Sequence, residues 1–326
     1  MSDYNVISND LLVERSQYDL YLADRIREQD SVSAETLAAS ITKAANQQVY
    51  YTIRFLVDRD RTDGAYRAYA YFRCVDDWLD GRALNRSERM SFVQRQQALI
   101  DCGYQGDFPH DLTLIERMLV DLIRSDQEQG SGLEWYIRNM MAVMTFDAER
   151  RGRLISQLEL TEYSRLLSTA VTEALHYFIG HDDPSPQIPT HYLAVTGAHI
   201  THMLRDTFED VATGYFNIPC EYLDSHELDP RDVSSDAYRG WVKSRVELAR
   251  TCFRAGKDYL AQVKNVRCRI AGYAYTARFE DVLTTIENDG CQLRPEYPER
   301  TSSRVALGMS GAILSMMVQG RNWSKL

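Results

Sequence analysis

The chain has 326 residues, of which 44% are hydrophobic and 26% are charged, and its formal net charge is −10. This balance is typical of a soluble globular protein whose core is large enough to hold a deep pocket. The acidic net charge, with no stripe of lysine and arginine, excludes a nucleic-acid partner and argues against electrostatic docking on an anionic membrane.

The cysteine pattern and the two ends of the chain predict a cytoplasmic protein. The six cysteines form no C-x-x-C pair, which fits free thiols in a reducing compartment. The first ten residues are polar and acidic, so no signal peptide is expected. The longest apolar run, residues 305–318, is shorter than the roughly 20 residues that span a bilayer. Shallow, peripheral membrane contact of this run is the alternative.

The order of predicted elements indicates an all-α fold. No proline precedes Pro109 and none lies between Pro109 and Pro184, and such stretches, rich in Leu, Ala, Arg and Glu, favour helices. Strand-like alternation is scarce. Loops are predicted over residues 181–189 and 217–235. Helices are predicted over residues 38–57, 65–80, 87–101, 111–125, 133–149, 162–178, 190–213, 237–263, 267–288 and 304–318.

The predicted domain organisation is simple. The sequence contains no internal repeat and no long flexible linker. We therefore expect a polar N-terminal segment over residues 1–37, one main helical domain over residues 38–300 and a C-terminal helix over residues 301–326.

The predicted helix over residues 65–80 carries a charged stripe. It reads AYRAYAYFRCVDDWLD, and Tyr69, Arg73, Asp76 and Asp80 fall on one helical face at i, i+4, i+7 and i+11, with Asp77 beside them. Most other positions are apolar, as in a core helix. Carboxylates in such surroundings are costly unless something neutralises them.

A second stripe lies in the predicted helix over residues 190–213. Residues 192–218 read YLAVTGAHITHMLRDTFEDVATGYFNI, and His199, His202, Asp206 and Asp210 fall at i, i+3, i+7 and i+11. Apolar residues fill much of the remainder. Two helices therefore each carry acidic residues through apolar surroundings.

The two stripes together predict a metal-assisted diphosphate site. Facing carboxylates suit Mg²⁺, which usually shares its ligands with substrate phosphates and water. Arg73 and Arg205 would bind phosphate oxygens, with Glu209 beside the second stripe. The simpler interpretation is two solvated helix faces with ordinary Asp–Arg pairing. An arginine at a matching offset in both stripes favours the site.

These residues resemble the squalene/phytoene synthase family. Its first signature, Y-x-x-x-R-x-x-D-D-x-x-D, is matched from Tyr69 to Asp80. Its second, L-R-D-x-x-E-D-x-x-x-G with a short Leu/Ile-Pro element after it, is matched from Leu204 to Pro219. A weaker third match to Y-x-x-I-L-x-x-I-E-x-x-G begins at Phe279, and the similarity covers residues 45–300.

The resemblance implies a fold, a reaction and a set of roles. The fold is a single-domain helical bundle of the isoprenoid-synthase type with a central cavity. The reaction is head-to-head condensation of two C15 or C20 prenyl diphosphates through a cyclopropyl diphosphate. Tyr69, Arg73 and Arg205 would orient the diphosphate and stabilise its departure. The metal ligands implied are Asp76, Asp80, Asp206 and Asp210, and the full predicted set of metal residues adds Asp77, Glu209 and His202.

Several positions depart from the family pattern. His199 and His202 stand in place of a usual Q-x-x-N, so that Mn²⁺ is a second candidate metal beside Mg²⁺. Glu173 lies in AVTEAL, where the family has the small-residue stretch V-A-G-x-V-G, and Phe279 replaces a tyrosine. The Ser-rich, Lys-containing patch before the first motif is replaced by residues 46–49. The predicted substrate-binding residues are Arg73, Arg205, Glu173, His199, His202 and Phe279.

Two other functions stay open at this point. The altered small-residue stretch and the absent Ser/Lys patch fit a terpene cyclase that ionises a single prenyl diphosphate. A non-catalytic relative acting as a binding or assembly protein would have little reason to keep all four stripe aspartates. The sequence leaves open the prenyl chain length, the need for NADPH, and whether the protein is a monomer or a homodimer.

Overall fold

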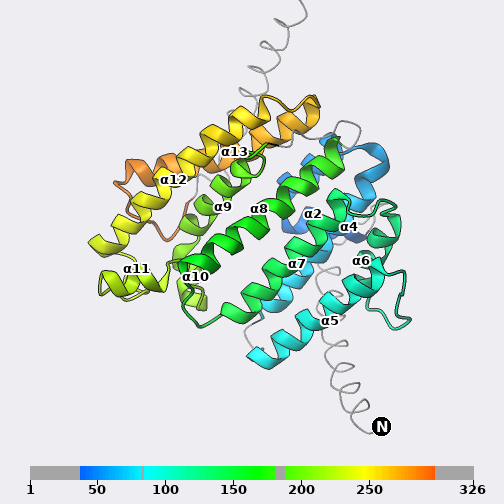
Figure 1. Ribbon diagram of the computed structural model, residues 1–326, viewed down its shortest axis with the longest axis horizontal. Coiled ribbons are helices and arrows are strands. Elements are labelled where there is room, and N and C mark those ends of the chain that lie inside the picture. The colour runs from blue at the N-terminus through cyan, green and yellow to red at the C-terminus, as the bar shows by residue number, and fades with distance from the viewer. Residues whose placement is uncertain (1–36, 82–83, 181–187, 298–326) are drawn as a thin grey trace, which may run out of the picture. The chain divides into compact units, whose positions relative to one another are not determined.

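The structure is a computed structural model that describes residues 37–81, 84–180 and 188–297 (Figure 1). All extended regular structure in these residues is helical, and the single β-bridge among them joins Ile155 to Pro219. The all-α prediction is confirmed. None of the described helices is both long and apolar enough to cross a membrane.

The chain forms two compact units, which divide within helix α7 between residues 137 and 138. The predicted domain boundaries near residues 38 and 300 stay predictions, as does the cytoplasmic location. The predicted N-terminal segment up to residue 36 and the predicted C-terminal helix lie outside the described residues.

The first unit is built around α4. Its helices are α2 (Leu37–Ala45), α3 (Gln47–Leu56), the 3₁₀ turn η1 (Arg59–Arg61), α4 (Thr62–Leu79), α5 (Arg86–Tyr104), α6 (Leu114–Ser125) and the start of α7 (Gly132–Arg150). Helix α4 packs against α2 and α6, and α5 packs against α6. Tyr71 and Val75 of α4 are fully buried, as is Leu119 of α6. Burial of this apolar surface is the main force that holds the unit together.

A buried polar group sits within the first unit's core. Glu116 is 3% exposed and accepts hydrogen bonds from Arg95 Nε at 2.6 Å and Gln96 Nε2 at 3.1 Å. The hydroxyl of Tyr71 donates to Gln96 Oε1 at 3.0 Å. Glu116 also forms a capping box with Thr113 at the start of α6. Each group is satisfied, so this network is structural.

The second unit surrounds α9. Its helices are the end of α7, α8 (Gln157–Gly180), α9 (Leu193–Arg205), α10 (Thr207–Thr213), α11 (Cys220–Ser225), α12 (Asp236–Leu260) and α13 (Val266–Asn288). Helix α9 packs against α8, α12 and α13. A Cβ atom on Gly256 of α12 would lie 2.4 Å from the backbone nitrogen of Ala194, so α9 and α12 approach backbone to backbone. Only glycine allows that approach.

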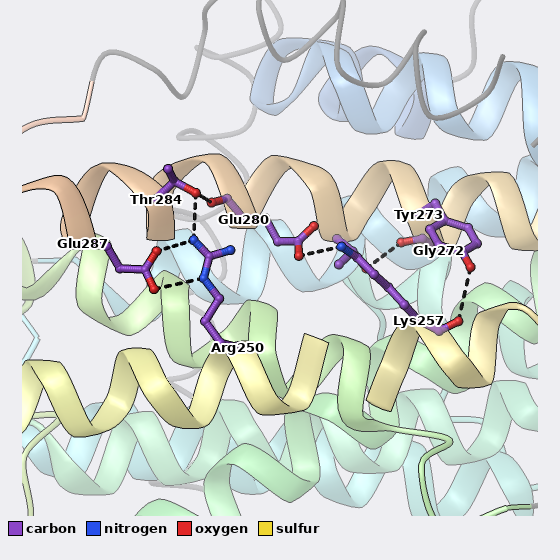
Figure 2. A network of polar contacts seen from close by, with 8 residues as sticks. Arg250, Lys257, Gly272, Tyr273, Glu280, Thr284 and Glu287 are labelled. Carbon is purple, nitrogen blue, oxygen red and sulfur yellow. Dashed lines mark hydrogen bonds and ion pairs between the residues drawn. The ribbon is translucent and has the colours of Figure 1, made fainter. Parts of the chain in front are cut away.

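Polar pairs join α12 to α13 on the surface of the second unit, where the two helices run side by side (Figures 1 and 2). Arg250 donates to Glu287 and to Thr284 Oγ1, the latter at 2.7 Å. Lys257 Nζ lies 2.6 Å from Glu280 Oε1. Because these pairs are partly exposed, they fix the register of the two helices more than they stabilise the fold.

Three predicted elements differ from the structure. The predicted helix over residues 38–57 is interrupted at Asn46, whose side chain accepts from Val49 N at 3.1 Å and so begins α3. The predicted helix over residues 190–213 is interrupted at Asp206. The predicted loop over residues 217–235 contains the short helix α11.

Candidate active site

The first acidic stripe lies on α4, which is continuous through it. Arg73 donates to Asp77 Oδ1, and its second terminal nitrogen lies 3.3 Å from Asp76 Oδ2. The side chains of Arg73 and Asp76 are 38% and 41% exposed, and that of Asp77 is 15% exposed. Asp80 is the exposed C-cap residue of α4. Tyr69 is half-buried, one helical turn before Arg73 and within its electrostatic reach.

The second acidic stripe lies where α9 ends and α10 begins. Asp206 is the junction residue, with φ −96° and ψ 7°. Helical hydrogen bonds nevertheless continue through it, from Asp206 N to His202 O at 3.0 Å and from Asp210 N to Asp206 O at 2.8 Å. The predicted alignment of these three residues therefore survives the break.

Asp206 is the most strongly held carboxylate of the second stripe. Arg205, whose side chain is 4% exposed, donates to both of its oxygens at 2.5 Å, and His202 Nε2 lies 2.9 Å from Oδ2. Burial opposes ionisation, but these hydrogen bonds outweigh it and hold the pKa of Asp206 below its usual range. Asp206 is therefore a fixed anion.

Asp210 is held by residues that the sequence did not point to. Asn217 Nδ2 donates to Asp210 Oδ2 at 2.7 Å, and Arg150 donates to Asn217 Oδ1 at 2.8 Å. Arg150, 5% exposed, also donates to Asp147 at 2.6 Å, and the Tyr163 hydroxyl donates to Asp147 at 3.0 Å. Asp147 and Arg150 lie at i, i+3 on α7, a readable ion-pair spacing, but no spacing links them to Asn217.

The environment of Asp210 carries a surplus of negative charge. Burial and then repulsion from Asp206 raise the pKa of Asp210 to about 7, although Arg150 and Asn217 act in the opposite sense. A cation between the two carboxylates would relieve this repulsion. Glu209, the remaining acidic residue of the motif, is exposed on α10.

The donor chemistry of both stripes fits a substrate-shared Mg²⁺ ion. No three His, Cys, Asp or Glu side chains within residues 37–81, 84–180 and 188–297 converge as in a preformed metal site. Mg²⁺ commonly binds through one or two carboxylates, completed by substrate phosphates and water. Two aspartates in each stripe meet that lower requirement.

Two other predicted residues lie close to the second stripe. Phe279 of α13 is 6% exposed, and its ring centroid lies 6.2 Å from that of His202. His199 of α9 is 3% exposed, and its ring meets that of Tyr163 edge to face at 5.0 Å. Both ring nitrogens of His199 lack a hydrogen-bond partner within the described residues.

Glu173 belongs to a different polar group within the second unit. It accepts from the Tyr192 hydroxyl at 2.8 Å and lies 4.0 Å from Nε2 of the buried His191. The His191 ring stacks on Tyr259, whose hydroxyl lies 2.7 Å from His176 Nε2. Burial raises the pKa of Glu173. The sequence identified Glu173 as unusual but missed its partners, Tyr192 and His191, which lie in a different segment of the chain.

Each acidic stripe is assembled within its own unit. The structure brings Arg73, Asp76 and Asp77 together in one unit, and it brings the residues of the second stripe together in the other. The prediction that the stripes face one another across a cavity stays a prediction. The same holds for the roles of the individual residues.

Comparison with known proteins found one matching family model and several solved structures with a similar fold. The family model for squalene/phytoene synthase matches residues 42–309. Squalene synthase HpnC from Alicyclobacillus acidocaldarius superposes with a TM-score of 0.62 at 17% identity, covering 79% of this chain and 94% of that one. A dehydrosqualene synthase in complex with ligand gives a TM-score of 0.64 at 13% identity, covering 94% and 98%. No curated protein sequence matches the chain.

Proposed function

Because this chain belongs to the squalene/phytoene synthase family, we propose that it ionises prenyl diphosphates and joins two of them head to head. The substrates would be C15 or C20 diphosphates, joined through a cyclopropyl diphosphate to a C30 or C40 product. The observation that carries the proposal is the arginine–aspartate pairing found in both stripes. Arg73 pairs with Asp76 and Asp77, and Arg205 pairs with Asp206.

The proposed roles follow from the charges in each stripe. Asp76 and Asp80, with Asp77 beside them, would hold Mg²⁺ on the first stripe. The ion, when bound, neutralises the charge that develops on a departing diphosphate. On the second stripe the metal ligands would be Asp206 and Asp210, with Glu209 and His202 as further candidates, and Mn²⁺ is the second candidate metal.

The two arginines would bind the diphosphate itself. Arg205 is fixed by its paired hydrogen bonds to Asp206, and its remaining N–H groups would donate to phosphate oxygens. Arg73 is half-exposed and would turn from Asp77 toward the substrate, with Tyr69 one turn away. Pre-positioned donors of this kind lower the barrier because they need little rearrangement as charge develops.

One observation favours a second candidate function, cyclisation of a single prenyl diphosphate. Glu173 and Tyr192 form a hydrogen-bonded polar pair where the family pattern has small residues that leave room for substrate. A wall of that kind would limit the space for a second prenyl chain. The ionisation step and its residues would be the same.

The experiment is to incubate the purified protein with Mg²⁺ and farnesyl or geranylgeranyl diphosphate, with and without NADPH, and to analyse the products by GC–MS. A C30 or C40 hydrocarbon, or a cyclopropyl diphosphate, supports condensation and gives the chain length and the NADPH requirement. A cyclic C15 or C20 product supports the cyclase. Absence of diphosphate release would support a non-catalytic binding or assembly role.

The remaining proposals concern the setting of the enzyme. We place it in the cytoplasm, as a monomer or homodimer, with peripheral membrane contact as the alternative. Sedimentation of the purified protein alone tests the oligomeric state, sedimentation with vesicles tests the membrane contact, and fractionation of cells tests the location.

A further inference from the structure

A cationic side chain on α12 lies on the buried face of that helix. Arg245 lies between Val242 and Ala249, at i−3 and i+4, and these neighbours are 1% and 0% exposed. The guanidinium carbon of Arg245 is 5.1 Å from the centroid of the Trp241 ring. The guanidinium at this position is therefore partly desolvated.

Arg245 has no anionic partner in the part of the chain that the structure describes. Its contacts there are the Trp241 ring and electrostatic interactions with Cys252 and His199. Burial lowers the pKa of Arg245, and the interaction with Cys252 opposes this shift only in part. Several other partly buried arginines contact a carboxylate, namely Arg73, Arg95, Arg150, Arg205, Arg250 and Arg294.

A second unsatisfied group lies within electrostatic reach of Arg245. His199 is 3% exposed, and neither ring nitrogen has a hydrogen-bond partner in the described residues. It lies on α9, which packs closely on α12: a Cβ atom on Gly197 would be 3.1 Å from the carbonyl oxygen of Ala249. Buried polar groups without partners are rare, and each calls for an explanation such as an absent ligand.

We propose that Arg245 and His199 form a metal-independent binding site for a diphosphate oxyanion. The guanidinium supplies charge and a fork of N–H donors, and the neutral imidazole of His199 supplies one further donor. A single bound anion would form an ion pair with Arg245 and accept a hydrogen bond from His199. The choice of diphosphate among oxyanions rests on the proposed function.

The site is separate from the carboxylates of the second stripe. His199 precedes Asp206 by two helical turns, about 10 Å along α9. A diphosphate at Arg245 would therefore lie beyond the ion that Asp206 and Asp210 are proposed to hold. The bound group comes either from a prenyl diphosphate or from the inorganic pyrophosphate that the reaction releases.

The test is calorimetric titration of the full chain with inorganic pyrophosphate in EDTA, so that no metal contributes. We expect saturable binding by the wild type and a loss of affinity of about tenfold or more in Arg245→Gln. Arg250→Gln, on the same helix but in a surface ion pair, is the matched control and keeps wild-type affinity. A parallel titration with a non-hydrolysable prenyl thiodiphosphate shows which source binds more tightly.

Thermal unfolding without ligand gives an independent readout. Arg245→Gln removes an uncompensated buried charge, so we expect its Tm to rise, whereas Arg245→Lys keeps the charge and shows no rise. His199→Gln should weaken pyrophosphate binding less than Arg245→Gln. Wild-type affinity in Arg245→Gln, or no binding by the wild type in EDTA, would overturn the inference. Turnover is assayed separately: binding without turnover contradicts only the proposed function, and turnover without binding contradicts only this site.

Discussion

The two acidic stripes carry the same kinds of residue but are held in different ways. In the first, Arg73 and the aspartates belong to one uninterrupted helix, and Arg73 and Asp76 are each about two-fifths exposed. In the second, Arg205 is almost fully buried against Asp206 at a helix junction. A hydrogen-bonded network that starts at Arg150 on another helix extends the second stripe.

The two stripes therefore have similar sequence motifs but differ in how easily their side chains can move. Exposed pairs are screened by water and contribute little to stability, so the first stripe can rearrange around a ligand at small cost. Buried pairs are fixed, because breaking one leaves an unpaired charge in a poorly solvated place. The side chains of the first stripe are therefore adaptable, and those of the second stripe are held in place before any ligand binds.

The largest effect is expected where both stripes serve the same chemistry. Asp76→Asn and Asp206→Asn should each lower the rate of diphosphate release by about 10²–10³, because each removes a well-placed charge from the proposed metal–diphosphate site. The measurement is release of pyrophosphate from a prenyl diphosphate in Mg²⁺. Asp63→Asn, an exposed change near the start of α4, is the control. Wild-type rates in either variant would remove that residue from the site.

A second pair of variants separates the stripes by stability. Arg205→Gln should lower the free energy of unfolding by about 3 kcal/mol, because it breaks a largely buried ion pair. Arg73→Gln should lower it by about 1 kcal/mol or less, because its partners are partly solvated. Urea denaturation followed by circular dichroism measures both. Equal losses would mean that the two stripes are held alike.

Local spacing was sufficient to predict the first stripe. Arg73, Asp76 and Asp77 are neighbours on one helix, and the 3.6-residue period fixes which of them meet. The same period also predicted the alignment of the second stripe correctly, although the helix is interrupted at Asp206, because the hydrogen bonds on both sides of that residue are helical. The break itself left no proline or glycine signal in the sequence.

Tertiary contacts account for what the sequence could not show. Asn217 follows Asp210 in the chain, yet its link to Arg150 depends on how the end of α7 meets the segment after α10. Arg245 is one of several charged residues in the sequence of α12, and only the structure shows that it has no anionic partner within the described residues. A sequence motif identifies residues that lie on the same helix. The residues that hold these motif residues in place, such as Arg150 and Asn217, come from other segments and are not part of the motif.

The supporting network of the second stripe can be weakened by one substitution. Asn217→Ala removes the donor to Asp210 and the acceptor for Arg150, so we expect a loss of about 1–2 kcal/mol in unfolding free energy. We also expect more Mg²⁺ to be needed for half-maximal rate, because Asp210 is no longer oriented. Thr213→Ala, an exposed change at the end of α10, controls for local effects. An unchanged Mg²⁺ requirement would show that the network is structural only.

Acid sensitivity between pH 6.5 and 4 should belong to the second unit, because the histidines whose pKa is lowered by burial lie there. Burial lowers the pKa of His176 to about 4, and that of His191 likewise. In the unfolded chain a histidine has a pKa of about 6.5. Between pH 4 and 6.5 the unfolded state therefore binds more protons than the folded state. These histidines should therefore lower the stability as the pH drops from about 6.5 toward 4. Asp210, whose pKa is raised to about 7, makes an opposing contribution that is lost as the pH rises through that value.

The measurement is urea denaturation at several pH values. His176→Gln, which can keep a hydrogen bond to Tyr259, should reduce the slope of unfolding free energy against pH by about 1 kcal/mol per pH unit in that window. His226→Gln, at an exposed position, is the control. An unchanged slope in His176→Gln would mean that the imidazole is not kept neutral by the fold.

The smallest effect is expected at the one exposed member of the second stripe's hydrogen-bonded group. His202 is 50% exposed, and its bond to Asp206 adds to two stronger bonds from Arg205. His202→Asn, which introduces the residue usual at this place in the family pattern, should keep the rate within about threefold, as surface substitutions commonly do. An imidazole is a better ligand for transition metals than an amide, so Mn²⁺ should support the variant less well relative to Mg²⁺. Parallel rates in the two metals measure this, and an inactive variant would mean that His202 takes part in the chemistry and that the second stripe is preset around it.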